Sequence, residues 1–299
     1  MKRGAKCNLR TRKSKFVEIF RTTPVKTVCP NFYVLAHADG CGFTPKCSYC
    51  YLKSSFWYLG GKARVFANTD RMLAEVERWI AKDNLESYVL NTGNLSDSLT
   101  FEEMRPLMAL LVKVFREKAT GRPHTLLLVT KGGQRECRSL LESKPCDNVT
   151  ISFSVNNAAA ARKYEKGAAT VADRLKAAAR LKKKGWRVRM RIDPMILGYD
   201  YTDVIKAVKK LRPERVTLGT LRAEKNLPKF TDKGMFQGLV PSPDPKALSR
   251  YPMDVRLGMY RPAVEALKGI CPMGLCEEMP ETWDSLGLNK ESKSCNCGG

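Results

Sequence analysis

The chain has 299 residues, of which 43% are hydrophobic and 28% charged, a composition typical of a folded protein with one large or two small domains. No apolar run is long enough to cross a bilayer, and the N-terminus lacks the apolar segment of a secretory signal. These features argue against a membrane or secreted protein and predict a cytoplasmic one. Lysine and arginine (53 residues) exceed aspartate and glutamate (30), giving a net charge of +23 that favours nucleic acid as a partner.

Residues 1–28 are basic and weakly patterned, so we predict a basic N-terminal arm or a loose strand. From residue 29 to 222, short apolar segments typical of buried strands alternate with amphipathic segments typical of helices. The predicted strands cover 32–36, 88–92, 125–131, 149–156, 188–194 and 215–221. The predicted helices cover 69–79 with Thr69 or Asp70 as N-cap, 101–117, 169–184 with Gly185 as C-cap, and 201–211.

Six β-α units in succession predict a parallel sheet with right-handed crossovers. Because six strands are too few for a standard eight-stranded barrel, we predict an α/β fold that forms a partial (β/α)6 barrel. Residues 223–299 lose the alternation and are predicted to form a C-terminal extension with its own cysteine group.

Three cysteines, Cys41, Cys47 and Cys50, follow the first predicted strand directly. In a cytoplasmic chain, closely spaced cysteines indicate metal or redox chemistry rather than disulfides. Three thiolates can bind three irons of a [4Fe–4S] cluster, which leaves the fourth iron open for S-adenosylmethionine (SAM). The alternative is a zinc site, for which Cys29 or His37 is the nearest fourth ligand.

Residues 40–52 resemble the cluster loop of the spore photoproduct lyase family. The spacing here is C-x5-C-x2-C, two residues longer between the first pair than the family's usual C-x3-C-x2-C. The segments 96–99, 129–131, 153–156, 164–165 and 173–174 are similar to later segments of that family, in the same order. The resemblance implies a partial barrel, a [4Fe–4S] cluster, SAM bound at the strand ends, thymine-containing DNA as substrate, and an electron donor such as flavodoxin or ferredoxin.

The same resemblance makes four residues candidate contacts of SAM or substrate: Ser96, Lys131, Ser154 and Asn156. Serine and asparagine supply hydrogen bonds, and lysine supplies a compact charge for carboxylate or phosphate. The alternative is that these side chains only complete hydrogen bonds at strand ends or add surface charge.

One departure from the family concerns the end of the reaction. The family's lyase returns a hydrogen atom to its product from a cysteine, and the corresponding residue here is Asn94. An amide is a far poorer hydrogen-atom donor than a thiol. This chain is therefore expected either to use another donor, for which Tyr49 and Tyr51 are candidates unless they only pack beside the cluster, or to perform a different radical reaction.

A second cysteine group lies near the C-terminus: Cys271, Cys276, Cys295 and Cys297. Four thiols could bind zinc or an auxiliary iron–sulfur cluster, and the alternative is a reduced tail without metal. The other cysteines, among them Cys29, are isolated in the sequence and are interpreted as small core residues or spare thiols.

Together these patterns predict a radical SAM enzyme acting on a thymine-type base in DNA, by rearrangement or modification or by photoproduct-lyase-like cleavage. A radical SAM enzyme acting on RNA or a peptide is a second hypothesis, because charge cannot distinguish DNA from RNA. A zinc-stabilised nucleic-acid-binding protein is the non-enzymatic one.

Overall fold

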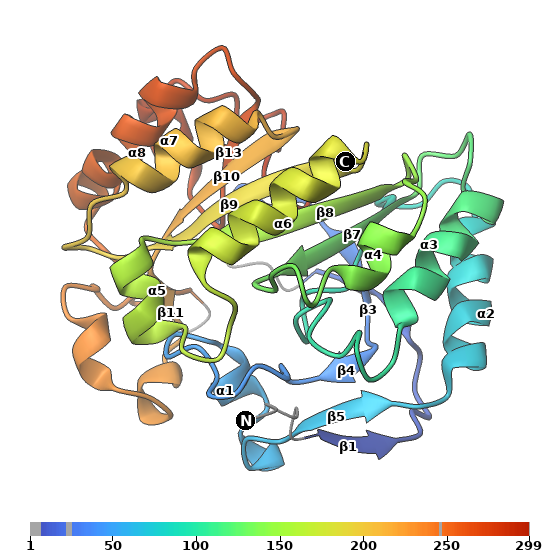
Figure 1. Ribbon diagram of the computed structural model, residues 1–299. Helices are drawn as coiled ribbons and strands as arrows, with labels where there is room; N and C mark the ends of the chain where they lie inside the picture. Colours follow the sequence, from blue (N-terminus) through green and yellow to red (C-terminus); the bar gives the residue numbers. More distant parts are fainter. Residues whose placement is uncertain (1–6, 22–25, 245–246, 299) are drawn as a thin grey trace.

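A computed structural model describes residues 7–21, 26–244 and 247–298. Its centre is an eight-stranded sheet of order β13-β10-β9-β8-β7-β6-β3-β2, in which all neighbours are parallel except the edge strand β2, which is antiparallel to β3 (Figure 1). The strands are β2 (Val17–Phe20), β3 (Phe32–Leu35), β6 (Val89–Asn91), β7 (Thr125–Thr130), β8 (Val149–Val155), β9 (Arg187–Met195), β10 (Arg215–Thr220) and β13 (Met273–Leu275). All six predicted strands are present, and the predicted partial barrel is confirmed.

The two faces of the sheet differ because apolar and polar residues alternate along the central strands. Side chains of successive residues point to opposite faces of a strand. On β8 and β9 the apolar set belongs to the main hydrophobic core: Val149, Ile151, Phe153, Val155, Val188, Met190 and Ile192. The intervening residues include Thr150, Ser152, Ser154 and Arg189, all buried and polar. The sequence therefore produces an apolar outer face and a polar interior.

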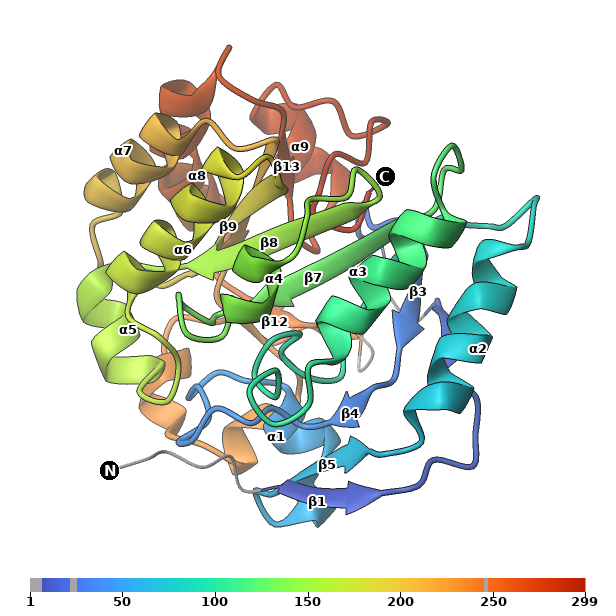
Figure 2. The same ribbon diagram turned by 45° about the vertical axis from the view of Figure 1, so that its right-hand side comes forward.

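The helices cover the apolar outer face and leave the interior to the loops (Figures 1 and 2). They are α2 (Thr69–Ile80), α3 (Leu107–Lys118), α4 (Arg138–Glu142), α5 (Ala158–Tyr164), α6 (Val171–Lys183), α7 (Thr202–Leu211), α8 (Met253–Leu267) and α9 (Pro280–Ser285). Burial of each leucine-sized side chain in this layer contributes about 1.5–3 kcal/mol, so the outer face carries much of the stability. In the described residues no helix is both long and apolar enough to cross a membrane.

The start of one helix and the N-cap of another differ from the predictions, whereas α6 and α7 begin within two residues of the predicted starts. The helix predicted from residue 101 begins at Leu107, because Pro106 is its N-cap and the preceding residues form turns. The N-cap of α2 is Asn68 rather than Thr69 or Asp70, and its side chain bonds the backbone of Arg12 instead of the helix. The predicted C-cap is confirmed: Gly185 has φ = 98°, a left-handed conformation that glycine adopts without strain.

The predicted N-terminal arm contains two paired strands among its described residues. Strand β1 (Cys7–Arg10) runs parallel to β5 (Ala63–Phe66), which pairs with β4 (Ala38–Asp39) in a small second sheet below the main one (Figure 2). The second strand of the arm is β2, which belongs to the main sheet. Residues 1–6 and 22–25 of the predicted arm lie outside the described residues.

The predicted C-terminal extension contributes to the same sheet, because β13 pairs with β10. It also contains the short strand β12 (Ser249–Arg250), which pairs antiparallel with β11 (Arg222–Ala223). Its last residues turn back into the polar interior. There the side chain of Ser152 bonds that of Asn296 at 2.6 Å, and Arg189 donates to the carbonyl oxygens of Asn296 and Gly298 at 2.9 and 2.8 Å.

Candidate active site

A cavity of about 810 Å³ lies at the carboxyl ends of the parallel strands. It is bounded by the loop after β3, by α1 (Leu52–Ser55), by strand ends from β6 to β10, and by the C-terminal segment. In parallel β/α folds this rim is where ligands bind. All three cysteines of the first group, Cys41, Cys47 and Cys50, line the cavity.

The cysteine loop is attached to its surroundings by backbone hydrogen bonds. The N–H of Gly40 donates to the carbonyl of Leu95 at 2.8 Å, and that of Ser48 donates to the carbonyl of Tyr164 at 2.7 Å. Gly42 packs so closely on Phe101 that a Cβ would lie 2.6 Å from the ring. The loop therefore has a defined path even though it contains no regular secondary structure at the cysteines.

The three thiols suit a group that binds them as thiolates. Burial raises the pKa of Cys41, Cys47 and Cys50, in the case of Cys47 to about 12, so bound metal is needed to hold the charged form at neutral pH. Among the described residues, no three cysteine, histidine or acidic side chains converge on one point to hold a single ion. A [4Fe–4S] cluster does not require such convergence, because each thiolate binds a different iron.

Under the loop lies a buried charge network centred on Glu165. This carboxylate forms ion pairs with Arg174 at 2.6 Å and with Lys131 at 3.7 Å, and it accepts hydrogen bonds from Tyr49 and Asn156. Burial alone would raise the pKa of Glu165, but Lys131 and Arg174 outweigh it and lower the pKa to about 2. Glu165 is therefore ionised, and it holds the tyrosine beside Cys47 in place.

The four residues predicted to contact SAM or substrate divide into two groups. Ser96, Lys131 and Ser154 line the cavity. Ser96 is 3% exposed, and within the described chain its hydroxyl has no hydrogen-bond partner, which leaves it free for a bound ligand. Asn156 is fully buried, bonds Glu165 and Tyr201, and is not among the lining residues.

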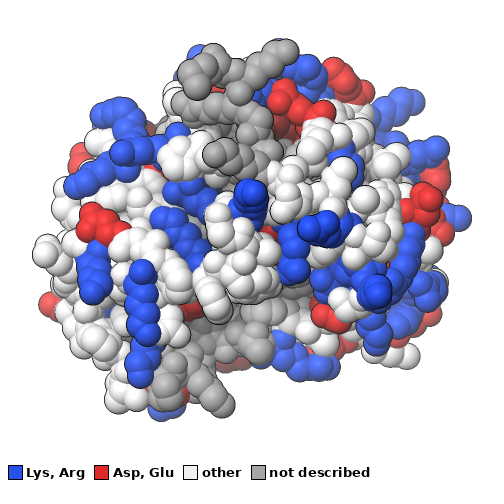
Figure 3. Space-filling model, turned by 90° about the horizontal axis from the view of Figure 1, so that it is seen from below, with Lys and Arg blue, Asp and Glu red and all other residues white. Residues whose placement is uncertain are grey.

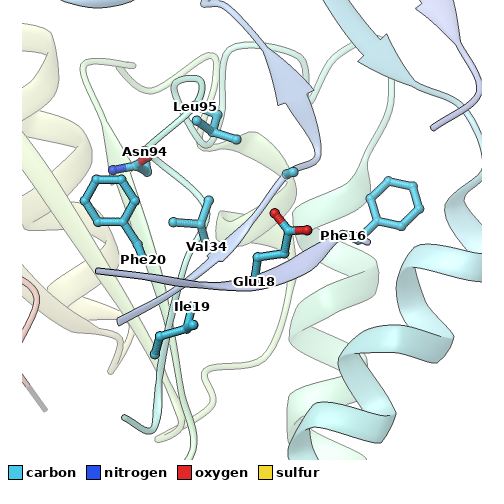
Figure 4. A pocket seen from close by; sticks show the side chains of 8 residues that line it. Phe16, Glu18, Ile19, Phe20, Val34, Asn94 and Leu95 are labelled. Atoms are coloured by element: carbon cyan, nitrogen blue, oxygen red, sulfur yellow. The ribbon is translucent and has the colours of Figure 1, made fainter. Parts of the chain in front are cut away.

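Asn94 and Tyr51 meet at the edge of the cavity. The Tyr51 hydroxyl donates to the backbone carbonyl of Asn94, and both residues line the main cavity. Asn94 also borders a smaller cavity of about 150 Å³, where Figure 4 shows it in the loop after β6, beside Phe20 of β2. Burial raises the pKa of Tyr51, so its phenol keeps its proton at neutral pH.

A second ionic cluster lines the cavity near the end of β9, and it is not predicted from the sequence. Asp193, at the end of β9, pairs with Arg191 and with Arg222, the latter at 2.9 Å, and Arg222 also pairs with Glu277. Although burial opposes ionisation, the two guanidinium groups lower the pKa of Asp193 well below its usual range. The only sequence signal for this cluster is Arg191, which lies in a basic stretch. Side chains alternate between the two faces of strand β9, and this alternation directs Arg191 towards the polar interior.

The predicted second cysteine group is not brought together as a whole. Cys276, Cys295 and Cys297 line the cavity that Cys41, Cys47 and Cys50 also line. Cys271 precedes β13 and lies at the amino end of that strand, where the next residue, Pro272, accepts a hydrogen bond from Val216. Cys29, interpreted from the sequence as isolated, lines the cavity with the other three.

Comparison with known proteins agrees with this architecture. The family described as "Spore photoproduct lyase" matches residues 8–223. Spore photoproduct lyase complexed with dinucleoside spore photoproduct superposes with a TM-score of 0.74 at 15% identity, covering 93% of this chain and 84% of that one. A double mutant with bound AdoMet and dinucleoside spore photoproduct gives a TM-score of 0.70 at 16% identity with the same coverage. No curated protein matches the chain.

A partial barrel with a three-cysteine loop after its first parallel strand is the architecture of a radical SAM enzyme of the photoproduct lyase type. The family match covers well over half of the sequence. The chain therefore belongs to the spore photoproduct lyase family.

Proposed function

We propose that the chain is a radical SAM enzyme that modifies or rearranges a thymine-type base in DNA, with photoproduct-like cleavage as the related alternative outcome. The observation that carries the proposal is the single cavity that joins Cys41, Cys47 and Cys50 to the polar strand-end residues Ser96, Lys131 and Ser154. A [4Fe–4S] cluster on the three cysteines, with SAM on its open iron, would supply a 5′-deoxyadenosyl radical.

The chain's own residues would position the ligands. Ser96, whose hydroxyl has no partner within the described chain, and Lys131 line the cavity and are suited to hydroxyl and carboxylate groups. Glu165 fixes Lys131 and Tyr49 from below. The electron required is proposed to come from a low-potential carrier such as flavodoxin or ferredoxin.

DNA as the substrate is supported by charge and by the relatives. Positively charged side chains predominate over negative ones on the face on which α1 lies (Figure 3). At the cavity, Lys225 is exposed on the rim, and Lys229 is exposed nearby. Phosphate groups on either side of an extruded base would find cations there. The structurally similar lyase carries a dinucleoside photoproduct.

Modification rather than cleavage is supported by Asn94. It lines the cavity and carries no thiol, whereas the family's lyase uses a cysteine at the corresponding position. A rearrangement in which the product radical regains its hydrogen from 5′-deoxyadenosine needs no such thiol.

The test is anaerobic incubation of reconstituted protein with SAM, dithionite and DNA that contains either the photoproduct or a modified thymine. We expect a new nucleoside by mass spectrometry from the modified-thymine DNA, and an Asn94→Cys variant serves to ask whether a thiol there favours cleavage. Formation of 5′-deoxyadenosine with neither DNA changed would refute the substrate assignment.

A further inference from the structure

Four cysteines from three separate segments line one cavity. Cys29 precedes β3, Cys276 follows β13, and Cys295 and Cys297 lie in the last described turn. All four line the cavity that also holds the first cysteine group. We propose that these four cysteines bind a second iron–sulfur cluster, and this proposal does not depend on the identity of the substrate.

The three segments are in direct contact. The backbone N–H of Val28 donates to the carbonyl of Glu278 at 2.8 Å, which sets residue 29 beside residue 277. Burial raises the pKa of Cys29, and the backbone of Glu277 acts in the opposite direction, so Cys29 lies near the residue after Cys276. Cys29 also lies near the two C-terminal thiols, because Cys295 contributes to the raised pKa of Cys29, and Cys29 contributes to the raised pKa of Cys297.

The surrounding charge is suited to an anionic cluster. The guanidinium groups of Arg222 and Arg191 donate to the sulfur of Cys276, at 3.1 and 3.4 Å. Arg191 also interacts electrostatically with Cys297. Four thiolates with iron and sulfide carry net negative charge, and N–H bonds to the sulfurs stabilise it and raise the reduction potential.

The choice of a cluster over zinc follows from the arrangement of the thiols. A structural zinc site needs four ligands around one point, and the described cysteines form no such group. Four cysteines are the ordinary ligand set of a [2Fe–2S] or a [4Fe–4S] cluster.

Cys29 distinguishes this proposal from a site made only of C-terminal cysteines. Cys271 is at the other end of β13 and does not line the cavity. The proposed site therefore joins the segment before the first barrel strand to the last described residues, and Cys271 provides a matched control.

The experiment uses the full chain reconstituted anaerobically with iron and sulfide. In a Cys41→Ala/Cys47→Ala/Cys50→Ala background, we expect about two or about four irons per chain to remain, according to cluster type. Adding Cys29→Ser should reduce this iron to background, whereas adding Cys271→Ser should leave it unchanged. Activity towards DNA is not needed for this measurement, so the proposed function can fail independently.

A second measurement covers the case in which Cys29→Ser impairs folding. In the triple-alanine background, alkylation of Cys29 and Cys297 should be slower after reconstitution than before, while Cys271 should react equally in both. The proposal would be overturned if the triple variant held only background iron, or if Cys29→Ser and Cys271→Ser lost equal amounts of iron. It would also be overturned by unchanged alkylation of Cys29, or by one zinc per chain in place of iron.

Discussion

The cavity is lined by two groups of cysteines, here called its first wall (Cys41, Cys47 and Cys50) and its second wall (Cys29, Cys276, Cys295 and Cys297), and the two groups are assembled in different ways. On one wall, Cys41, Cys47 and Cys50 lie in a single loop whose path is set by nearby backbone hydrogen bonds and by the Glu165 network below it. On the other wall, the cysteines come from both ends of the described chain and meet only when the sheet is complete. The first wall therefore depends on local geometry and buried charge, and the second depends on the assembled fold.

The largest expected effect is on the first wall. Cys50→Ser should remove a cluster ligand, and SAM cleavage should fall to the level of protein-free controls, measured as 5′-deoxyadenosine formed anaerobically. Cys7→Ser is the matched control, because Cys7 lies on β1 outside the cavity. Full activity of Cys50→Ser would show that the loop does not bind the cluster.

The next largest effect is expected when the buried charge of Glu165, below the cysteine loop, is removed. Glu165→Gln should lower the free energy of unfolding by about 3–5 kcal/mol, because Arg174 is fully buried and would lose its charged partner. Urea denaturation measures the change. Glu86→Gln alters solvent-exposed contacts with Arg21 and Asn31 and should change the free energy of unfolding far less. Similar losses of unfolding free energy for both variants would mean that the buried ion pairs of Glu165 contribute no more to stability than an exposed pair.

A pH effect is expected at the start of the loop. His37 is 2% exposed, and burial together with Arg105 lowers its pKa from 6.5 to about 3. The unfolded chain therefore takes up a proton below about pH 6.5 while the folded chain does not, so stability falls as pH decreases from about 6.5 towards 3.

The matching variant is His37→Gln, which keeps a donor for the carbonyl of Thr92, now bonded at 3.0 Å. Its stability should fall less steeply with acid than that of the wild type, by about 1.4 kcal/mol for each unit of pKa shift removed. Thermal unfolding across this pH range measures the difference, and parallel curves would contradict the assignment.

The smallest effect concerns the second wall. Asn296→Ala removes the partner of the buried Ser152 hydroxyl and should cost about 1–3 kcal/mol. Ser292→Ala, in an exposed turn of the same tail, should change stability by less than about 0.5 kcal/mol. Equal effects in chemical denaturation would show that the tail is not an integral part of the interior.

This difference between the walls explains what could be predicted. The six strands and the cysteine loop follow from apolar patterning and close spacing, both of which are local in sequence. The family resemblance includes Glu165 and Arg174 but does not show that they pair, since the two residues lie on separate segments. Cys29 is isolated in sequence, and only β3 and β13, placed in one sheet, bring it beside Cys295. Contacts between residues so far apart in the sequence depend on the topology of the sheet, which cannot be inferred from the spacing of residues.

The position of the tail also affects the order in which the molecule can be completed during synthesis. The helices that cover the outer face emerge from the ribosome soon after the strands they protect. Arg189 and Ser152, in contrast, have their interior partners in residues 296–298. A nascent chain therefore holds a covered outer layer and an open polar interior until these residues are released. The proposed second cluster would form only after that point.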